Sequence, residues 1–106
     1  MLGQGGHLRL HLLSAHLDRN LGGPLNKMDP FVWIRVGGQE WRSQVCVNGG
    51  KNPHWTLQFM QVETNLFTHQ MHIQVCDKDP LKAPLIGEAH VPLSIFTQSG
   101  PREEWI

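Results

Sequence analysis

Two aspartates directly after a strand pattern have the spacing that best suits metal chemistry. Asp77 and Asp79 lie two positions apart, and an extended backbone directs both side chains the same way. Ca²⁺ takes about six to eight oxygen ligands, mostly carboxylates and carbonyls. The pair is therefore a candidate for part of a calcium site. The alternative is a structural role, in which the carboxylates cap a loop or pair with Lys27, Lys78 or Lys82.

Seven histidines are a second candidate set for metal binding. His7 and His11 share one face of a predicted strand, whereas His69 and His72 point to opposite sides of another. Neither pair has the companion cysteines or the HExxH helix motif of zinc sites. We therefore expect surface histidines and no zinc site.

Motifs of the common catalytic mechanisms do not occur in the sequence. It contains no G-x-S-x-G turn, no phosphate-cradling glycine loop and no catalytic cysteine motif. The glycine pairs at 37–38 and 49–50 follow strand patterns and open no helix, which indicates turns. We therefore expect a protein that is not an enzyme.

The elements that must position these residues are short strands. Apolar and polar residues alternate over residues 7–12, 31–36, 39–47, 55–59, 71–75 and 86–93, and residues 103–106 resemble the start of a seventh strand. No long apolar repeat has helical spacing, and residues 93–98 allow one helical turn at most. Several short strands separated by turn residues predict an all-β antiparallel sandwich.

Four motifs follow one another in a fixed order. They are an Asp-Pro-aromatic strand entry at 29–31, an Asn-Pro-x-Trp strand entry at 52–55, an Asp-x-Asp strand exit at 77–79 and an Ile-Gly strand start at 86–87. Together they resemble a C2 domain, most closely the single-domain plant elicitor-responsive type. The resemblance implies an eight-stranded Greek-key β-sandwich with three loops at one end. It divides the chain into a flexible N-terminus, residues 1–6, and one C2 domain, residues 7–106, whose last strand is missing.

The resemblance also implies a ligand set for calcium. It brings Asp29 to the same end of the sandwich as Asp77 and Asp79, at three of the family's calcium-binding positions. The backbone carbonyls of Met28 and Lys78 are further ligands by the same resemblance.

This ligand set is incomplete. C2 domains that bind two or three calcium ions usually use five acidic side chains. The acid expected in the first loop falls at Gly22 or Gly23, and the last acid of the third loop falls at Pro84. We therefore expect at most one weakly bound calcium ion and a weakened calcium dependence.

Basic and apolar residues share these loops, and C2 domains commonly dock on anionic phospholipid through them. The expected membrane or partner contacts are Arg19, Leu25, Lys27, Lys78, Leu81 and Lys82. Alternatively, the leucines fold back on the sandwich and the lysines are merely solvated. Many C2 domains also bind phosphoinositides through a lysine-rich strand pair. Here Arg42 is the only lysine or arginine in the corresponding residues, 39–47, so we expect that site to be lost.

A calcium-independent protein-interaction or scaffold module is the alternative function. A sheet margin left open by the missing strand would accept a partner strand. Trp55 is expected in the core, while Trp33 or Trp41 is either an exposed interface anchor or part of the strand packing.

Charge and composition limit the remaining classes. The 106 residues carry nine Lys+Arg and nine Asp+Glu, which argues against a nucleic-acid partner. No run of eighteen apolar residues occurs, and the start of the chain has no leader pattern. We therefore expect a cytoplasmic protein, peripheral at membranes, with Cys46 and Cys76 reduced.

Overall fold

The computed structural model describes residues 6–22, 27–64, 69–79, 82–96, 103, 105 and 106. Its elements, in chain order, are β1 (Gly6–Ser14), β2 (Pro30–Val36), β3 (Gln39–Arg42), β4 (His54–Thr64), β5 (Gln70–Asp77), β6 (Leu85–Pro92) and the 3₁₀ turn η1 (Leu93–Phe96). Among the described residues, no helix is long and apolar enough to cross a membrane.

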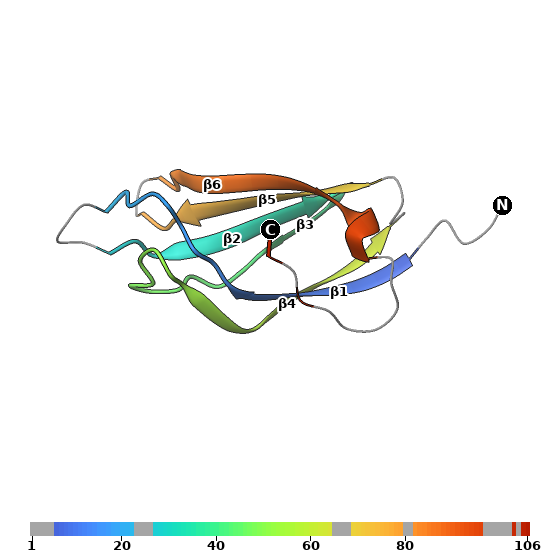
Figure 1. Ribbon diagram of the computed structural model, residues 1–106, viewed down its shortest axis with the longest axis horizontal. Helices are drawn as coiled ribbons and strands as arrows, with labels where there is room; N and C mark the ends of the chain where they lie inside the picture. The colour runs from blue at the N-terminus through green and yellow to red at the C-terminus, as the bar shows by residue number, and fades with distance from the viewer. Residues whose placement is uncertain (1–5, 23–26, 65–68, 80–81, 97–102, 104) are drawn as a thin grey trace.

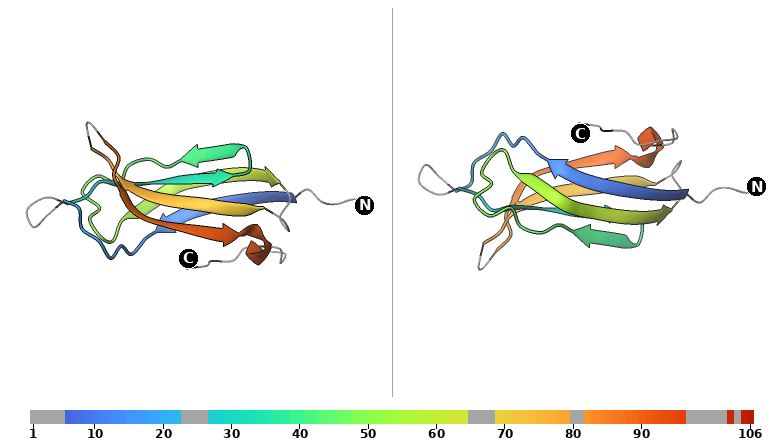
Figure 2. Two further views of the ribbon diagram at one scale, coloured as in Figure 1. Left: turned by 90° about the horizontal axis from the view of Figure 1, so that it is seen from above. Right: turned by 90° about the horizontal axis from the view of Figure 1, so that it is seen from below.

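The strands form two layers that face each other (Figures 1 and 2). One is a four-stranded sheet with the order β3-β2-β5-β6, and the other pairs β1 with β4. Every pairing is antiparallel, and the chain passes from one sheet to the other between β1 and β2, between β3 and β4, and between β4 and β5. The predicted all-β antiparallel sandwich is therefore confirmed.

The core lies between the two layers and follows the alternation of the sequence. Every second residue of β2 is buried in it: Val32, Ile34 and Val36. From the other layer, Met60 and Val62 of β4 face them. The elements beyond β4 complete the cluster with Met71, Val91 and Leu93, the last from η1. Trp55 also lies in this cluster, as predicted from the sequence.

Strand β3 covers residues 39–42, whereas the sequence predicted a strand over residues 39–47. It ends early because the side chain of Ser43 takes the place of a backbone carbonyl in the hydrogen bonding to β2. The N–H of Ser43 still donates to the Val32 carbonyl at 2.8 Å. The N–H of Val32, however, donates to the Ser43 Oγ at 2.8 Å rather than to a backbone carbonyl. The ladder therefore ends at Arg42, and the chain turns into the loop that follows.

The end of the described chain also differs from the prediction. The expected helical turn is present as η1, over residues 93–96. Residues 103, 105 and 106, where a seventh strand was predicted to start, are not part of a strand. Sequence alternation alone does not form a strand, because a strand also needs a hydrogen-bonded neighbour.

Candidate functional site

Three loops meet at one end of the sandwich, on the left of Figure 1. They connect β1 to β2, β3 to β4, and β5 to β6. Backbone hydrogen bonds tie the first two together, because the N–H of Leu17 donates to the Lys51 carbonyl at 2.8 Å and that of Gly50 donates to the Met28 carbonyl at 3.0 Å. The described parts of the first two loops are therefore joined directly by their backbones.

Asp29 and Asp77 are in direct contact at this end. Strands β2 and β5 pair Pro30 with Asp77, so Asp29 lies one residue beyond the pairing. The N–H of Asp29 donates to the Oδ1 of Asp77 at 2.8 Å. The N–H of Lys78 donates in return to the Asp29 carbonyl at 2.9 Å. The two half-buried aspartates are thus joined by a hydrogen bond from the backbone of Asp29 to the carboxylate of Asp77, and the backbone of Lys78 reinforces the contact.

The Asp29 carboxylate reaches the loop between β3 and β4. Its Oδ1 accepts a hydrogen bond from the N–H of Asn48 at 2.7 Å. Asn48 adopts a φ of 57°, in the left-handed region that asparagine tolerates better than most residues. One carboxylate therefore links two of the three loops.

Asp79 is hydrogen-bonded twice to Lys82, three residues further along the chain. Its N–H donates to the carbonyl of Lys82 at 3.1 Å, and its Oδ1 accepts from the Lys82 N–H at 3.3 Å. The sequence allowed a structural role as the alternative to metal binding, in which a carboxylate caps its own loop. The Asp79 carboxylate makes such a hydrogen bond, to the N–H of Lys82.

Asp29 and Asp77 are in contact and Asp79 follows Asp77 by two residues, but a different set of metal-binding side chains lies closest together. Within the described ranges, the one set of three such side chains whose donor atoms all lie within 4.8 Å of one another is His72, Glu88 and His90. The sequence had paired His72 with His69 along the chain and did not identify this set.

The remaining residues of the predicted site have different environments. Met28 is fully buried, and its carbonyl already accepts the Gly50 hydrogen bond. The cationic side chains of the predicted contact surface are exposed: Arg19, Lys27, Lys78 and Lys82. Leu25 and Leu81 lie outside the described residues.

A cationic and aromatic cluster on the outer face of the four-stranded sheet was not found from the sequence. The Arg35 guanidinium lies 3.8 Å from the centre of the Trp33 ring, and that of Arg42 lies 4.8 Å from it. Strand β3 brings Arg42 opposite Trp33. The sequence prediction was based on residues 39–47 alone. It did not include Arg35, which lies on the neighbouring strand β2 and joins Arg42 at Trp33.

Cys76 is not an activated nucleophile. Both cysteines are free thiols, and Cys76 is buried. Burial raises the pKa of the Cys76 thiol, and Arg42 and Arg35 oppose this effect more weakly. A raised pKa keeps the group in its unreactive thiol form near neutral pH.

Comparisons with known proteins agree with this architecture. A family model of the C2 domain matches residues 6–106. Extended synaptotagmin-1 of Mus musculus is 36% identical over 104 residues, which cover 93% of this chain and 9% of that protein. The chain therefore spans about a tenth of the length of such relatives.

Two solved structures share both sequence and fold with the chain. A C2 domain-containing protein from a putative elicitor-responsive gene has a TM-score of 0.67 at 28% identity, covering 87% of this chain and 67% of that one. A calcium-bound pair of C2 domains from extended synaptotagmin 2 gives a TM-score of 0.69 at 26% identity, covering 85% of this chain and 35% of that one. With the antiparallel sandwich, the loops gathered at one end and the family match over residues 6–106, the chain belongs to the C2 domain family.

Proposed function

We propose that the chain is a non-catalytic C2 targeting module that docks on anionic phospholipid membranes with a weakened dependence on calcium. The observation that carries the proposal is the loop end, where the contact between Asp29 and Asp77 lies among exposed cationic side chains. C2 domains are generally non-catalytic and commonly bind Ca²⁺, membranes or proteins. In the cell, such a module would be cytoplasmic and peripheral at membranes.

The charge balance of the loop end explains why calcium would help without being essential. The described loop residues and the adjoining Asp77 contribute five cationic side chains and four carboxylates: Arg19, Lys27, Lys51, Lys78 and Lys82 against Asp18, Asp29, Asp77 and Asp79. This end is nearly neutral without metal, and one bound Ca²⁺ would add two positive charges. Each cationic residue at an anionic surface contributes about 1 kcal/mol, so the protein's own residues supply part of the attraction.

The proposed calcium ligands are the carboxylates of Asp29, Asp77 and Asp79, with the carbonyls of Met28 and Lys78. One oxygen of each carboxylate already accepts a backbone hydrogen bond, from Asn48, Asp29 and Lys82 respectively. Ca²⁺ takes about six to eight oxygens, so water would complete the coordination. Three carboxylates and shared carbonyls support one ion of low affinity.

The proposed membrane contacts are Arg19, Leu25, Lys27, Lys78, Leu81 and Lys82. Cosedimentation with phosphatidylserine/phosphatidylcholine vesicles tests them. The double variant Lys78→Gln/Lys82→Gln should lose most of the binding, because it removes two exposed loop cations. The matched control is the double variant Arg9→Gln/Arg42→Gln, which also removes two exposed cations, from β1 and β3. Equal losses in both variants would show that overall charge, rather than the loop end, directs binding.

One observation favours a protein-interaction module as the second candidate. The outer side of the two-stranded sheet exposes apolar residues, with Leu13 at 50%, Leu57 at 92% and Phe59 at 42% exposure. Leu57 also has a φ of 56°, which is costly for a leucine. This candidate predicts no binding to anionic vesicles and loss of partner binding in the variant Leu57→Ser.

A further inference from the structure

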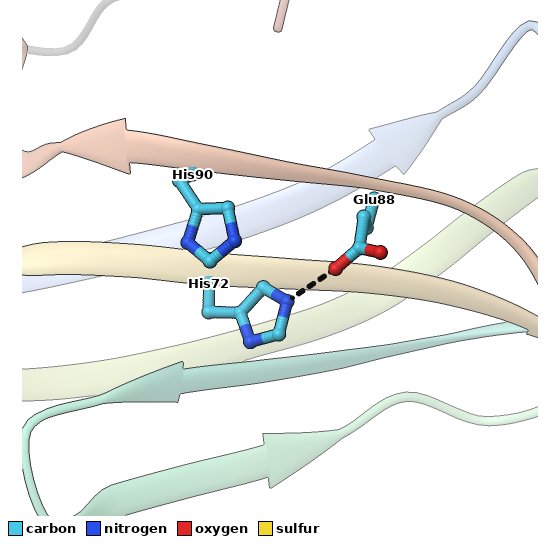
Figure 3. Close-up of side chains that lie close together, drawn as sticks. All are labelled: His72, Glu88 and His90. Carbon is cyan, nitrogen blue, oxygen red and sulfur yellow. Dashed lines mark hydrogen bonds and ion pairs between the residues drawn. The ribbon is translucent and has the colours of Figure 1, made fainter.

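Three metal-binding side chains meet on the outer face of the four-stranded sheet (Figure 3). Strands β5 and β6 pair His72 directly with His90, and the next outward pair contains Glu88. Their neighbours Met71 and Val91 are buried in the core. Because side chains alternate along a strand, His72, Glu88 and His90 point away from the other layer.

The three side chains are already close to one another. The Nε2 of His72 lies 2.8 Å from the Oε1 of Glu88. The rings of His72 and His90 stack with their centres 4.3 Å apart and their planes 7° from parallel. All three donor atoms lie within 4.8 Å of one another. The side chains of His72 and Glu88 are 25% and 43% exposed, and His90 is exposed, so ions have access from solvent.

We propose that His72, Glu88 and His90 form a binding site for a divalent transition metal ion, with Zn²⁺ as the test ion. Two imidazole nitrogens and one carboxylate oxygen are a ligand set that suits zinc. Calcium prefers oxygen ligands alone, so this set selects against it. The fourth position of a tetrahedral site would be open to water.

The geometry requires a small closure of the side chains. Zinc ligands at about 2.0–2.2 Å from the metal lie roughly 3.4 Å from each other in a tetrahedron. The donor atoms lie within 4.8 Å of one another, so binding requires the exposed His90 and Glu88 side chains to rotate until this separation is reached. The backbone remains fixed, because the cross-strand pairing holds His72 opposite His90.

Nearby charges partly oppose and partly support the ion. Arg35 of β2 is paired with His72 across the sheet. Its guanidinium is stacked on Trp33, and its Nε lies 3.7 Å from the Oε2 of Glu40 on β3. The Glu40 carboxylate offsets the charge of Arg35, and Glu88 adds a negative charge to the site.

This site is separate from the calcium site proposed at the loops. His72 and Asp77 lie five residues apart on the extended strand β5. At a rise of about 3.3 Å per residue, their Cα atoms are roughly 17 Å apart. Zinc binding at the sheet and calcium binding at the loops are therefore independent events, and either proposal can fail without the other.

Calorimetric titration of the tag-free full chain with ZnCl₂ at a pH of about 7.4 tests the proposal, with Co²⁺ absorption as a readout of coordination. We expect one Zn²⁺ per chain with a dissociation constant below about 100 μM. His90→Gln and His72→Gln should each weaken binding about tenfold or more, and Glu88→Gln should weaken it as well. His54→Gln is the matched control, since His54 is an exposed histidine on β4 of the other sheet, and Asp77→Asn reports any binding at the loops.

The outcomes are distinct. Stoichiometric binding that is lost in His90→Gln and His72→Gln, and kept in His54→Gln and Asp77→Asn, supports the site. His90 is exposed, so its variant keeps the fold, which circular dichroism verifies. The absence of binding, or binding that His90→Gln leaves unchanged, overturns the proposal.

Discussion

The N–H of Asp29 donates a hydrogen bond to the Oδ1 of Asp77 at 2.8 Å, across 48 positions of sequence. The bond joins the loop that enters β2 to the end of β5 and places two carboxyl groups at one end of the sandwich. Asp29 in turn holds the N–H of Asn48, so one chain of hydrogen bonds connects three loops. The aspartates therefore stabilise the loop end whether or not a cation is bound.

Removing the Asp77 acceptor should destabilise the protein. We expect Asp77→Ala to lower the free energy of unfolding by about 1.5–3 kcal/mol, because the half-buried Asp29 N–H loses a charged acceptor. Asp77→Asn keeps an acceptor oxygen and should cost less. Urea denaturation measures both, with Asp18→Ala, an exposed loop carboxylate, as the control. An Asp77→Ala variant as stable as the control would show that this bond contributes little.

Calcium binding should be weak and involve one ion. Calorimetric titration of the chain with CaCl₂ should give no two-site isotherm at millimolar or tighter affinity, because Gly22, Gly23 and Pro84 provide no side-chain ligand. If the titration shows heat from calcium binding at a single site, the variant Asp29→Asn should abolish it. A clear biphasic isotherm would contradict the proposed incomplete site.

A methyl group at Gly49 should disturb the loop between β3 and β4. A Cβ there would lie 2.7 Å from the Cys46 Sγ, 3.0 Å from the Pro53 Cβ and 3.1 Å from the Cys46 carbonyl oxygen. We expect Gly49→Ala to destabilise the protein by about 1–3 kcal/mol, measured by thermal unfolding. Gly38→Ala is a matched control, since nothing lies within 4 Å of a Cβ at that position. Equal stabilities of the two variants would contradict the close approach at Gly49.

The buried Ser43 should contribute more to stability than its size suggests. Its Oγ accepts from the Val32 N–H and donates to the Gln44 carbonyl, each at 2.8 Å. Ser43→Ala leaves the buried N–H of Val32 without an acceptor, so we expect a loss of about 1–3 kcal/mol in the free energy of unfolding. The exposed Thr56→Ala serves as the comparison in the same urea titration. A loss no larger than that of Thr56→Ala would show that water replaces the hydroxyl.

The two cysteines should differ in reactivity. Burial raises the pKa of Cys76, so less thiolate is present at any given pH, and disulfide-exchange reagents should label it slowly. The single-cysteine variants Cys46→Ala and Cys76→Ala separate the two rates. Fast labelling of the folded Cys46→Ala variant at a pH of about 8 would contradict the burial of Cys76.

The raised pKa of Cys76 also fixes the sign of its effect on stability. The folded state favours the neutral thiol, so this contribution is fully present below the pKa of the unfolded thiol. It is lost as the pH rises through the higher pKa of the folded protein. Stability should therefore fall on the alkaline side, and Cys76→Ala should reduce that fall.

The sequence predicted the fold well because the sandwich depends on local alternation. The residues that β2 contributes to the central core, Val32, Ile34 and Val36, occupy every second position, and the turn at Gly37 has the positive φ of 57° that glycine allows. The contact between Asp29 and Asp77 was anticipated only through the resemblance to a known family, because nothing local relates residues 48 positions apart.

The rest depends on pairing between strands, which spacing along the chain does not show. His72, Glu88 and His90 meet because β5 and β6 align in one register, and a shift of one residue would turn them to different faces. The same holds for Arg35 and Arg42 at Trp33. Strand β3 ends early because the Ser43 hydroxyl, rather than a backbone carbonyl, accepts the hydrogen bond from the Val32 N–H. The alternation of apolar and polar residues does not predict such a change.

The most direct test of the proposed function is cosedimentation with phosphatidylserine vesicles at low salt, in the presence of calcium and of a chelator. We expect binding in both conditions, with calcium increasing the affinity by less than about tenfold, and weaker binding at high salt. Binding that disappears completely in the chelator, or no binding to anionic vesicles in either condition, would contradict the proposed docking.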